Sequence, residues 1–141
     1  MPNDVFLDSS YAIALAAVSD RLHTSAIEIA ERMRAEQRHL VTTHAVLCEI
    51  ANSLAKPRYR AAAVQLLHSI QADASIELVA ISDDLLAKGF SLYSQRMDKQ
   101  WGLTDCISFV VMQERGITEA LTADGHFQQA GFVALPGSAI C

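Results

Sequence analysis

The stretch Asp4-Val5-Phe6-Leu7-Asp8-Ser9-Ser10-Tyr11 decides the fold of this chain. A short apolar run ends in an acid, and hydroxyl residues then open a helix-like pattern over residues 9–18. This order predicts a buried strand over residues 4–8 that delivers Asp8 to a strand–helix junction. Because ligands of open α/β sheets gather beyond the carboxyl ends of the strands, we expect chemistry at Asp8.

The composition is that of a chain that can bury a core but has no excess of positive charge. Of its 141 residues, 51% are hydrophobic and 19% are charged, and the formal net charge is -5. This length suits a single domain over residues 1–141. The negative charge argues against binding of nucleic acid through bulk positive charge. It leaves a nuclease possible, because a bound divalent metal reverses the sign of an acidic pocket.

The cysteines and the apolar segments indicate a cellular compartment. Cys48, Cys106 and Cys141 are odd in number and widely spaced, so they predict neither a disulfide framework nor a zinc site. A reducing cytosol fits this usage. We expect no signal peptide, because the amino terminus lacks a basic start followed by a long apolar run. No apolar stretch approaches the roughly 20 residues that span a bilayer, so we expect a cytoplasmic protein without membrane contact.

Strand-like and helix-like segments alternate along the rest of the chain. The further predicted strands cover residues 40–43, 76–81, 120–123 and 132–135. The further predicted helices cover residues 22–37, 44–55, 58–73, 82–97 and 104–114. Residues 98–103 are expected to form a loop, and residues 125–131 a turn-rich connection. Such alternation implies an α/β fold in which right-handed helical crossovers join parallel strands.

Four acids fall where this arrangement brings distant segments together. Asp8 and Asp124 each follow a predicted strand, so both belong to one rim of a parallel sheet. Glu49 lies about one and a half turns into its helix, and Asp105 lies in the first turn of the helix that precedes the fourth strand. Two carboxylates about 4 Å apart repel by roughly 1 kcal/mol in water and by about 4 kcal/mol at an effective dielectric constant near 20. Four of them at one rim therefore require compensation.

That compensation can take the form of raised pKa values, basic partners or a divalent cation. No His or Cys ligand pattern is evident near these acids, and ligands made of oxygen alone suit Mg²⁺ or Mn²⁺. Such ions support phosphoryl transfer because they bind phosphate, lower the pKa of a bound water and offset charge in the transition state.

Each acid also has a purely structural interpretation. Asp8 is equally suited to cap a helix or form a turn. Asp105 fits the favourable interaction of an acid with a helix amino terminus. Glu49 suits a solvated face or a buried ion pair, and Asp124 before Gly125 suits a plain turn. Only their joint placement indicates a site.

Four segments together resemble a known family. They are Val5-Phe6-Leu7-Asp8-Ser9-Ser10, Glu49-Ile50-Ala51-Asn52-Ser53-Leu54, Leu103-Thr104-Asp105-Cys106-Ile107-Ser108-Phe109 and Leu121-Thr122-Ala123-Asp124-Gly125-His126-Phe127. Through them the chain resembles PIN-domain proteins and, among these, the small VapC-type toxin ribonucleases of bacterial toxin–antitoxin modules. The resemblance covers essentially the whole chain, and the third and fourth segments are the most specific.

The resemblance implies a three-layer fold, in which helices flank a central parallel five-stranded sheet of order 3-2-1-4-5. It implies that Asp8, Glu49, Asp105 and Asp124 form an acidic metal site for Mg²⁺ or Mn²⁺. The implied activity is metal-dependent cleavage of RNA, restrained by a cognate antitoxin protein. Target choice does not carry over, because residues 56–100 are where members of the family differ.

Two hydroxyl residues stand beside the predicted ligands. Ser9 follows Asp8 and Thr104 precedes Asp105, so each can support a ligand carboxylate or cap its own helix. Capping is the favoured role for both. His126 near Asp124 can assist the chemistry, although a histidine in a turn is more often a structural hydrogen-bonding group.

Two groups of basic residues are candidates for contact with RNA. Lys56, Arg58 and Arg60 surround Tyr59 and can form a phosphate-binding patch, because basic residues interleaved with aromatics often bind RNA. The competing interpretation, a solvated helix start, is favoured. Arg96, Lys99 and Trp101 form a second candidate group, although a lone tryptophan in a loop more often packs on the core.

The predicted helices over residues 22–37 and 58–73 carry apolar stripes that exceed what one core can cover. A helix of an antitoxin can use this excess, and so can a second copy of the chain in a homodimer.

Two other functions remain open at this point. A haloacid-dehalogenase-like phosphatase would use Asp8 as a nucleophile, but such enzymes have a second Asp where this chain has Ser10. A catalytically silent PIN fold would serve as an interaction module, yet a scaffold has no need for a repulsive group of four acids.

Overall fold

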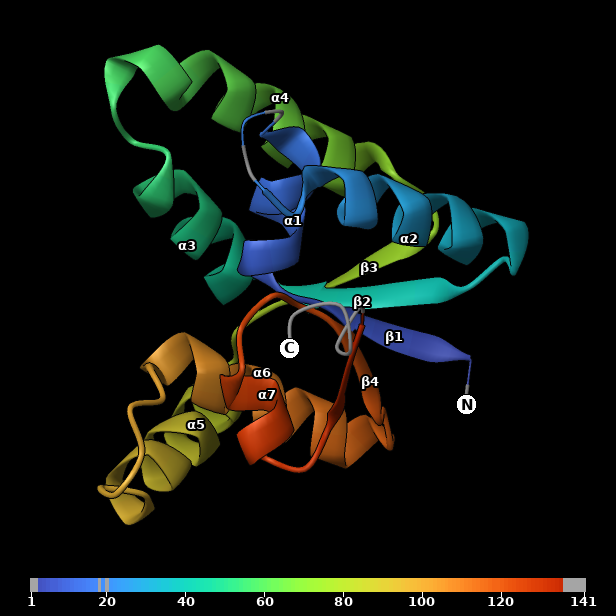
Figure 1. The fold of residues 1–141 in the computed structure, drawn as a ribbon. Coiled ribbons are helices and arrows are strands. Elements are labelled where there is room, and N and C mark those ends of the chain that lie inside the picture. The colour runs from blue at the N-terminus through green and yellow to red at the C-terminus, as the bar shows by residue number, and fades with distance from the viewer. Residues whose placement is uncertain (1–2, 18, 20, 136–141) are drawn as a thin grey trace.

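The computed structural model describes residues 3–17, 19 and 21–135 of the chain (Figure 1). Its elements are β1 (Asp4–Leu7), α1 (Ser9–Ala16), α2 (His23–Ala35), β2 (His39–Thr43), α3 (His44–Ser53), α4 (Pro57–Ala72), β3 (Ile76–Val79), α5 (Asp83–Gln95), α6 (Leu103–Arg115), β4 (Glu119–Leu121), α7 (His126–Gln129) and β5 (Val133–Leu135). These strands form one sheet of order β3-β2-β1-β4-β5, and every neighbouring pair is parallel. The predicted α/β fold and sheet order are confirmed.

Helices cover both faces of the sheet. Figure 1 shows α1, α2 and α4 on one face, and α5, α6 and α7 on the other. β1 lies in the middle of the sheet, and Val5 and Phe6 have no exposed surface. A parallel sheet enclosed in this way needs strands that are apolar on both faces, which explains the continuous apolar run of β1.

One helix was not expected from the sequence. α7 lies inside residues 125–131, which were predicted to be a connection without a helix. A single turn of four residues is too short to show helical periodicity. The expected helix over residues 9–18 ends at Ala16 as α1, and residue 18 of that prediction lies outside the described residues.

α5 and α6 pack closely against each other. A Cβ atom added to Gly89 would lie 2.6 Å from Cγ1 of Ile107, so the two helices approach as closely as a glycine allows. The carboxyl end of α6 is closed by Gly116 at φ 68°, a left-handed conformation that suits glycine. Within the described residues, no helix is both long enough and apolar enough to cross a membrane.

Candidate functional site

The carboxyl ends of β1 and β4 form the floor of the candidate site. The two strands are parallel neighbours, and the backbone N–H of Asp8 donates to the carbonyl of Leu121 at 3.0 Å. Asp8 therefore leaves the sheet beside the last residue of β4, and Asp124 follows three positions further along the chain. Strand pairing alone brings these two acids to one rim, as predicted.

Two hydroxyl groups hold one oxygen of Asp8. Ser10 Oγ donates to Asp8 Oδ2 at 2.6 Å, and Thr122 Oγ1 donates to the same oxygen at 2.7 Å. Ser10 Oγ also accepts from the backbone N–H of Ala123, and Thr122 Oγ1 accepts from that of Asp124. Among the described residues, Oδ1 of Asp8 has no hydrogen-bond partner. The carboxylate is thus fixed through one oxygen while the other stays available to a ligand.

Asp105 meets Asp124 through a histidine. Asp105 Oδ2 accepts from the backbone N–H of Gly102 at 3.1 Å and lies 2.9 Å from His126 Nδ1. The same nitrogen lies 3.3 Å from Asp124 Oδ2, and the backbone N–H of His126 donates to Asp124 Oδ1. One ligand atom from each of these three side chains falls within 4.8 Å of the others. The expectation of acids without a nearby histidine is therefore wrong.

Glu49 reaches the site from α3. Thr43 begins that helix at the end of β2 by accepting the N–H of Val46, which places Glu49 a short way into α3. Ser9 Oγ donates to Glu49 Oε1. Glu49 lies outside the group of atoms around His126, but its charge acts on Asp8.

The electrostatics agree with this geometry. Burial raises the pKa of Asp8, and the charges of Glu49 and Asp124 raise it further, whereas the hydrogen bonds from Ser10 and Thr122 lower it. Burial likewise raises the pKa of Asp105, with further increases from Asp124 and Asp8 and a decrease from the His126 and Gly102 contacts. The side chains of Asp8 and Asp105 are thus costly to ionise in the folded protein.

A divalent cation fits the chemistry of this donor set. Asp105 and Asp124 offer carboxylate oxygens close together. Asp8 lies outside that group of atoms, but its charge acts on Asp105, and the charges of Asp124 and Glu49 act on Asp8. A positive ion would offset the mutual repulsion that otherwise raises the pKa values of the buried acids. The cluster can hold a metal ion.

For two hydroxyl residues the favoured capping role is wrong, and for Ser9 the alternative role, support of a carboxylate of the site, is confirmed. Ser9 does not cap α1; its side chain holds Glu49 instead. Thr104 does not cap α6, because that helix begins at Leu103 with Gly102 as its cap, and no side-chain hydrogen bond is found for Thr104 among the described residues. The hydroxyl groups that do hold Asp8 belong to Ser10 and Thr122, which sequence reasoning missed although each lies two residues from a predicted acid.

The first group of basic residues lies away from the acids. Lys56 caps α4, which begins beyond the far end of α3, and ten residues of α3 separate it from the rim by about 15 Å. Arg60 donates to the carbonyl of Ala55, and Arg58 lies over the ring of Tyr59. These contacts agree with the favoured interpretation, a solvated helix start.

Trp101 belongs to the core. It is 6% exposed, packs edge-on against Phe109 with ring centroids 5.0 Å apart, and donates from Nε1 to Gln129. The guanidinium of Arg96 lies 5.0 Å from the centre of its ring. The tryptophan is therefore a packing residue and has no accessible face on which to stack a base.

Thr122→Ala is expected to lower the affinity for a divalent ion about tenfold, the usual effect of removing a group that orients a ligand. Thr122→Ser keeps the hydroxyl and is expected to keep the affinity. Isothermal titration with Mn²⁺ measures both. Ser94→Ala is the control, because that exposed hydroxyl bonds only within α5. Equal affinities for the alanine and serine variants would contradict the orienting role of Thr122.

The known proteins that are similar to this chain point to one family. A family model described as the PIN domain matches residues 5–133. The 23S rRNA-specific endonuclease VapC20 of Mycobacterium tuberculosis, in two strains, is 28% identical over 130 residues, which are 92% of this chain and 95% of that protein. The crystal structure of VapC20, described as a sarcin-ricin loop cleaving toxin, matches with a TM-score of 0.80 and 27% identity over 92% of this chain and 96% of that one. VapBC2 of Rickettsia felis, bound to a DNA fragment from its promoter, matches with a TM-score of 0.68 and 12% identity over 93% and 96% of the two chains, and so shares the fold.

Proposed function

The chain belongs to the PIN domain family, and on that premise we propose that it is a metal-dependent endoribonuclease, the toxin of a toxin–antitoxin pair. The observation that carries the proposal is the close group of Asp105 and Asp124 beside the buried Asp8, where β1 and β4 end. The likeness to VapC20 over nine-tenths of both chains supports RNA as the substrate. A protein that acts on ribosomal RNA works in the cytoplasm, which is the location we propose.

We assign Mg²⁺ or Mn²⁺ to Asp8, Asp105 and Asp124, with Glu49 completing the site. When bound, such an ion neutralises charge on the phosphate and makes water more acidic. The chain supplies the orientation: Ser10 and Thr122 hold Asp8 Oδ2, and the Gly102 N–H holds Asp105 Oδ2. The burial of both carboxylates excludes the bulk water that would weaken their attraction for a cation.

Glu49 is the residue we assign to accept the proton of the attacking water. Ser9 Oγ holds its Oε1, and among the described residues Oε2 has no hydrogen-bond partner. Glu49 is also more exposed than Asp8 and Asp105, so it is within reach of solvent. A fixed and accessible carboxylate is suited to general-base work.

An RNA cleavage assay tests the proposal. The substrates are an oligonucleotide that contains a sarcin–ricin loop and total cellular RNA, each incubated with Mg²⁺, with Mn²⁺ and with EDTA. We expect cleavage at defined positions in the presence of metal and none with EDTA. Intact RNA under every condition would reject the nuclease and favour an interaction module.

A cavity between helices on one face of the sheet supports the proposal of an antitoxin partner. About 440 Å³ of space lies between α2, α4 and the sheet, and its apolar lining includes Leu15, Ala30, Met33, Leu66 and Ile70. Leu15 lies on α1, and the other four lie on α2 and α4, the two helices whose apolar stripes were expected to exceed the core. We propose that a helix of the antitoxin fills this cavity.

Ala30→Glu is expected to prevent capture of the antitoxin encoded beside this chain, because it places a charge in the apolar cavity, and to leave RNA cleavage unchanged. Ala35→Glu is the matched control, since Ala35 lies on the exposed side of the same helix and does not line the cavity. Co-purification of the tagged variants measures the effect. Undiminished capture by the Ala30 variant would place the antitoxin elsewhere.

A further inference from the structure

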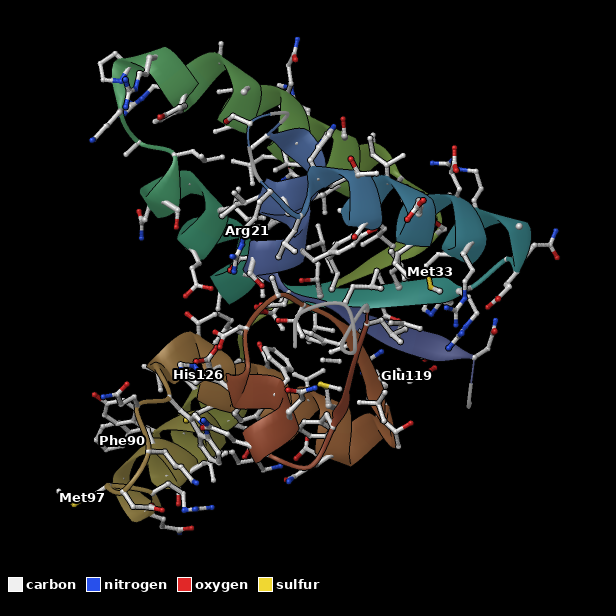
Figure 2. All side chains as sticks on the ribbon, viewed as in Figure 1. Arg21, Met33, Phe90, Met97, Glu119 and His126 are labelled. Carbon is white, nitrogen blue, oxygen red and sulfur yellow. The ribbon has the colours of Figure 1, made fainter. Side chains whose placement is uncertain are left out.

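The side chain of His126 places a nitrogen among the carboxylates of the site. Its Nδ1 is 2.9 Å from Asp105 Oδ2 and 3.3 Å from Asp124 Oδ2, and the side chain is 27% exposed. Figure 2 labels this histidine at the start of α7. The nuclease proposal makes no use of the imidazole of His126, so the position of this side chain requires a separate explanation.

The position of His126 is rigidly determined. The next residue, Phe127, has no exposed surface and packs against Phe109 and Phe6, with ring centroids 5.0 and 6.1 Å away. The backbone N–H of His126 donates to Asp124 Oδ1 at 2.9 Å. The backbone of His126 is thus held by a buried anchor on one side and by a predicted ligand on the other, which favours a pre-organised site.

The spacing of the three side chains matches that of neighbouring ligands on one ion. Adjacent ligands of a six-coordinate ion at about 2.1 Å lie about 3 Å apart. The two distances from Nδ1 to the carboxylate oxygens bracket this value, and all three atoms lie within 4.8 Å of one another. In the tautomer that carries its proton on Nε2, Nδ1 offers a lone pair to such an ion.

We propose that His126 is a nitrogen ligand of the metal and makes the site select Mn²⁺ over Mg²⁺. The inference rests on the proposed function and names the ion for it. Imidazole binds first-row transition ions, whereas Mg²⁺ prefers oxygen ligands and keeps its waters. A site of carboxylates alone discriminates between the two ions less.

The competing role for His126 is that of a hydrogen-bond donor to Asp105. A donor would orient Asp105 and affect both ions equally, and a glutamine amide could replace it. A nitrogen ligand affects Mn²⁺ more than Mg²⁺, and glutamine does not restore the preference. The two roles therefore predict different results for the same variants.

The test measures binding of Mn²⁺ and Mg²⁺ by isothermal titration to the unmodified protein, His126→Ala and His126→Gln. We expect both variants to bind Mn²⁺ about tenfold more weakly and Mg²⁺ about as before, the lower end of what loss of a metal-site group costs. His68→Gln, on the exposed side of α4, is the matched control and is expected to change neither affinity. Pulsed electron paramagnetic resonance of the unmodified protein with Mn²⁺ is expected to show coupling to one nitrogen, which is lost in both His126 variants.

Absence of nitrogen coupling in the unmodified protein would overturn the proposal without any variant. So would an equal loss of affinity for both ions, or a glutamine variant that keeps the Mn²⁺ preference. These results leave the nuclease intact, because Asp8→Asn would still abolish ion binding. If the unmodified protein binds neither ion, the proposed metal dependence and this inference fail together.

Discussion

Asp8→Asn is expected to abolish RNA cleavage and, at the same time, to raise the melting temperature of the ion-free protein. Activity falls by more than about a hundredfold, because loss of even an outer partner of a metal ligand costs 10–100-fold. Stability rises because Asp8 is 2% exposed and burial raises its pKa, so its ionised form opposes folding at neutral pH. Asparagine keeps the shape of the side chain, and its oxygen can still accept from Ser10 and Thr122.

The dependence of stability on pH checks the electrostatic part of this prediction. Asp8 and Asp105 have higher pKa values in the folded protein than in the unfolded chain, so their protonated forms stabilise the fold. This stabilisation is fully present below about pH 3.8 and is lost as the pH rises through the raised pKa values of the two residues. In EDTA, the stability gained by Asp8→Asn over the unmodified protein is therefore expected to grow with pH across that window. Thermal unfolding followed by circular dichroism measures it.

Glu28→Gln provides the control, because Glu28 is exposed on α2 and takes no part in the cluster or in the pKa shifts of Asp8 and Asp105. This exchange of an acid for its amide is expected to change neither cleavage nor the pH dependence. Undiminished cleavage by Asp8→Asn would remove Asp8 from the site. A lower melting temperature of that variant in EDTA would mean that the ionised carboxylate stabilises the fold.

Removal of the metal is the second large effect that we expect. A ligand at 100 times its dissociation constant stabilises the native state by about 2.7 kcal/mol. For a domain of this size, 1 kcal/mol corresponds to about 3 °C, so saturation with Mn²⁺ or Mg²⁺ is expected to raise the melting temperature by roughly 8 °C. EDTA is expected to reverse this shift in melting temperature, because the repulsion among the acids then has no counter-charge. It is also expected to stop cleavage, because it removes the metal.

Asp105→Asn separates this effect from unspecific salt. Asp105 contributes a carboxylate to the cluster and also accepts from the backbone N–H of Gly102, the N-cap of α6, a bond that the amide oxygen of asparagine can keep. We expect the variant to fold and to show no shift with either ion, as measured by differential scanning fluorimetry. An equal shift in the variant, or cleavage by the unmodified protein in EDTA, would contradict the assigned site.

The order of the elements and the rim that carries the acids were available from local patterns. The apolar run of β1 and the alternation of strands with helices imply a parallel sheet, and in such a sheet Asp8 and Asp124 must emerge on the same edge. The order β3-β2-β1-β4-β5 followed from the family resemblance and was confirmed. Each of these inferences depends on periodicity or on residues close together in sequence.

The errors concern contacts that local patterns do not encode. Ser9 and Thr104 have the right chemistry for helix caps. In the structure, however, Ser9 donates to Glu49, and α6 already begins at Leu103, the residue before Thr104. The basic residues around Lys56 are not among these errors, because a solvated helix start was the favoured interpretation and their contacts agree with it.

By itself the sequence determined the fold class and the shared rim of Asp8 and Asp124, because strand and helix periodicities and the positions of acids after strands are local properties of the chain. The addition of Glu49 and Asp105 to that rim came from the family resemblance. Only the tertiary structure decided how those acids are held. The bond from Thr122 to Asp8 spans 114 positions, and the contact between His126 and Asp105 spans 21. Such contacts depend on strand pairing and on the burial of Phe127, so side chains with no pattern in sequence become neighbours only when the sheet and its helices have packed.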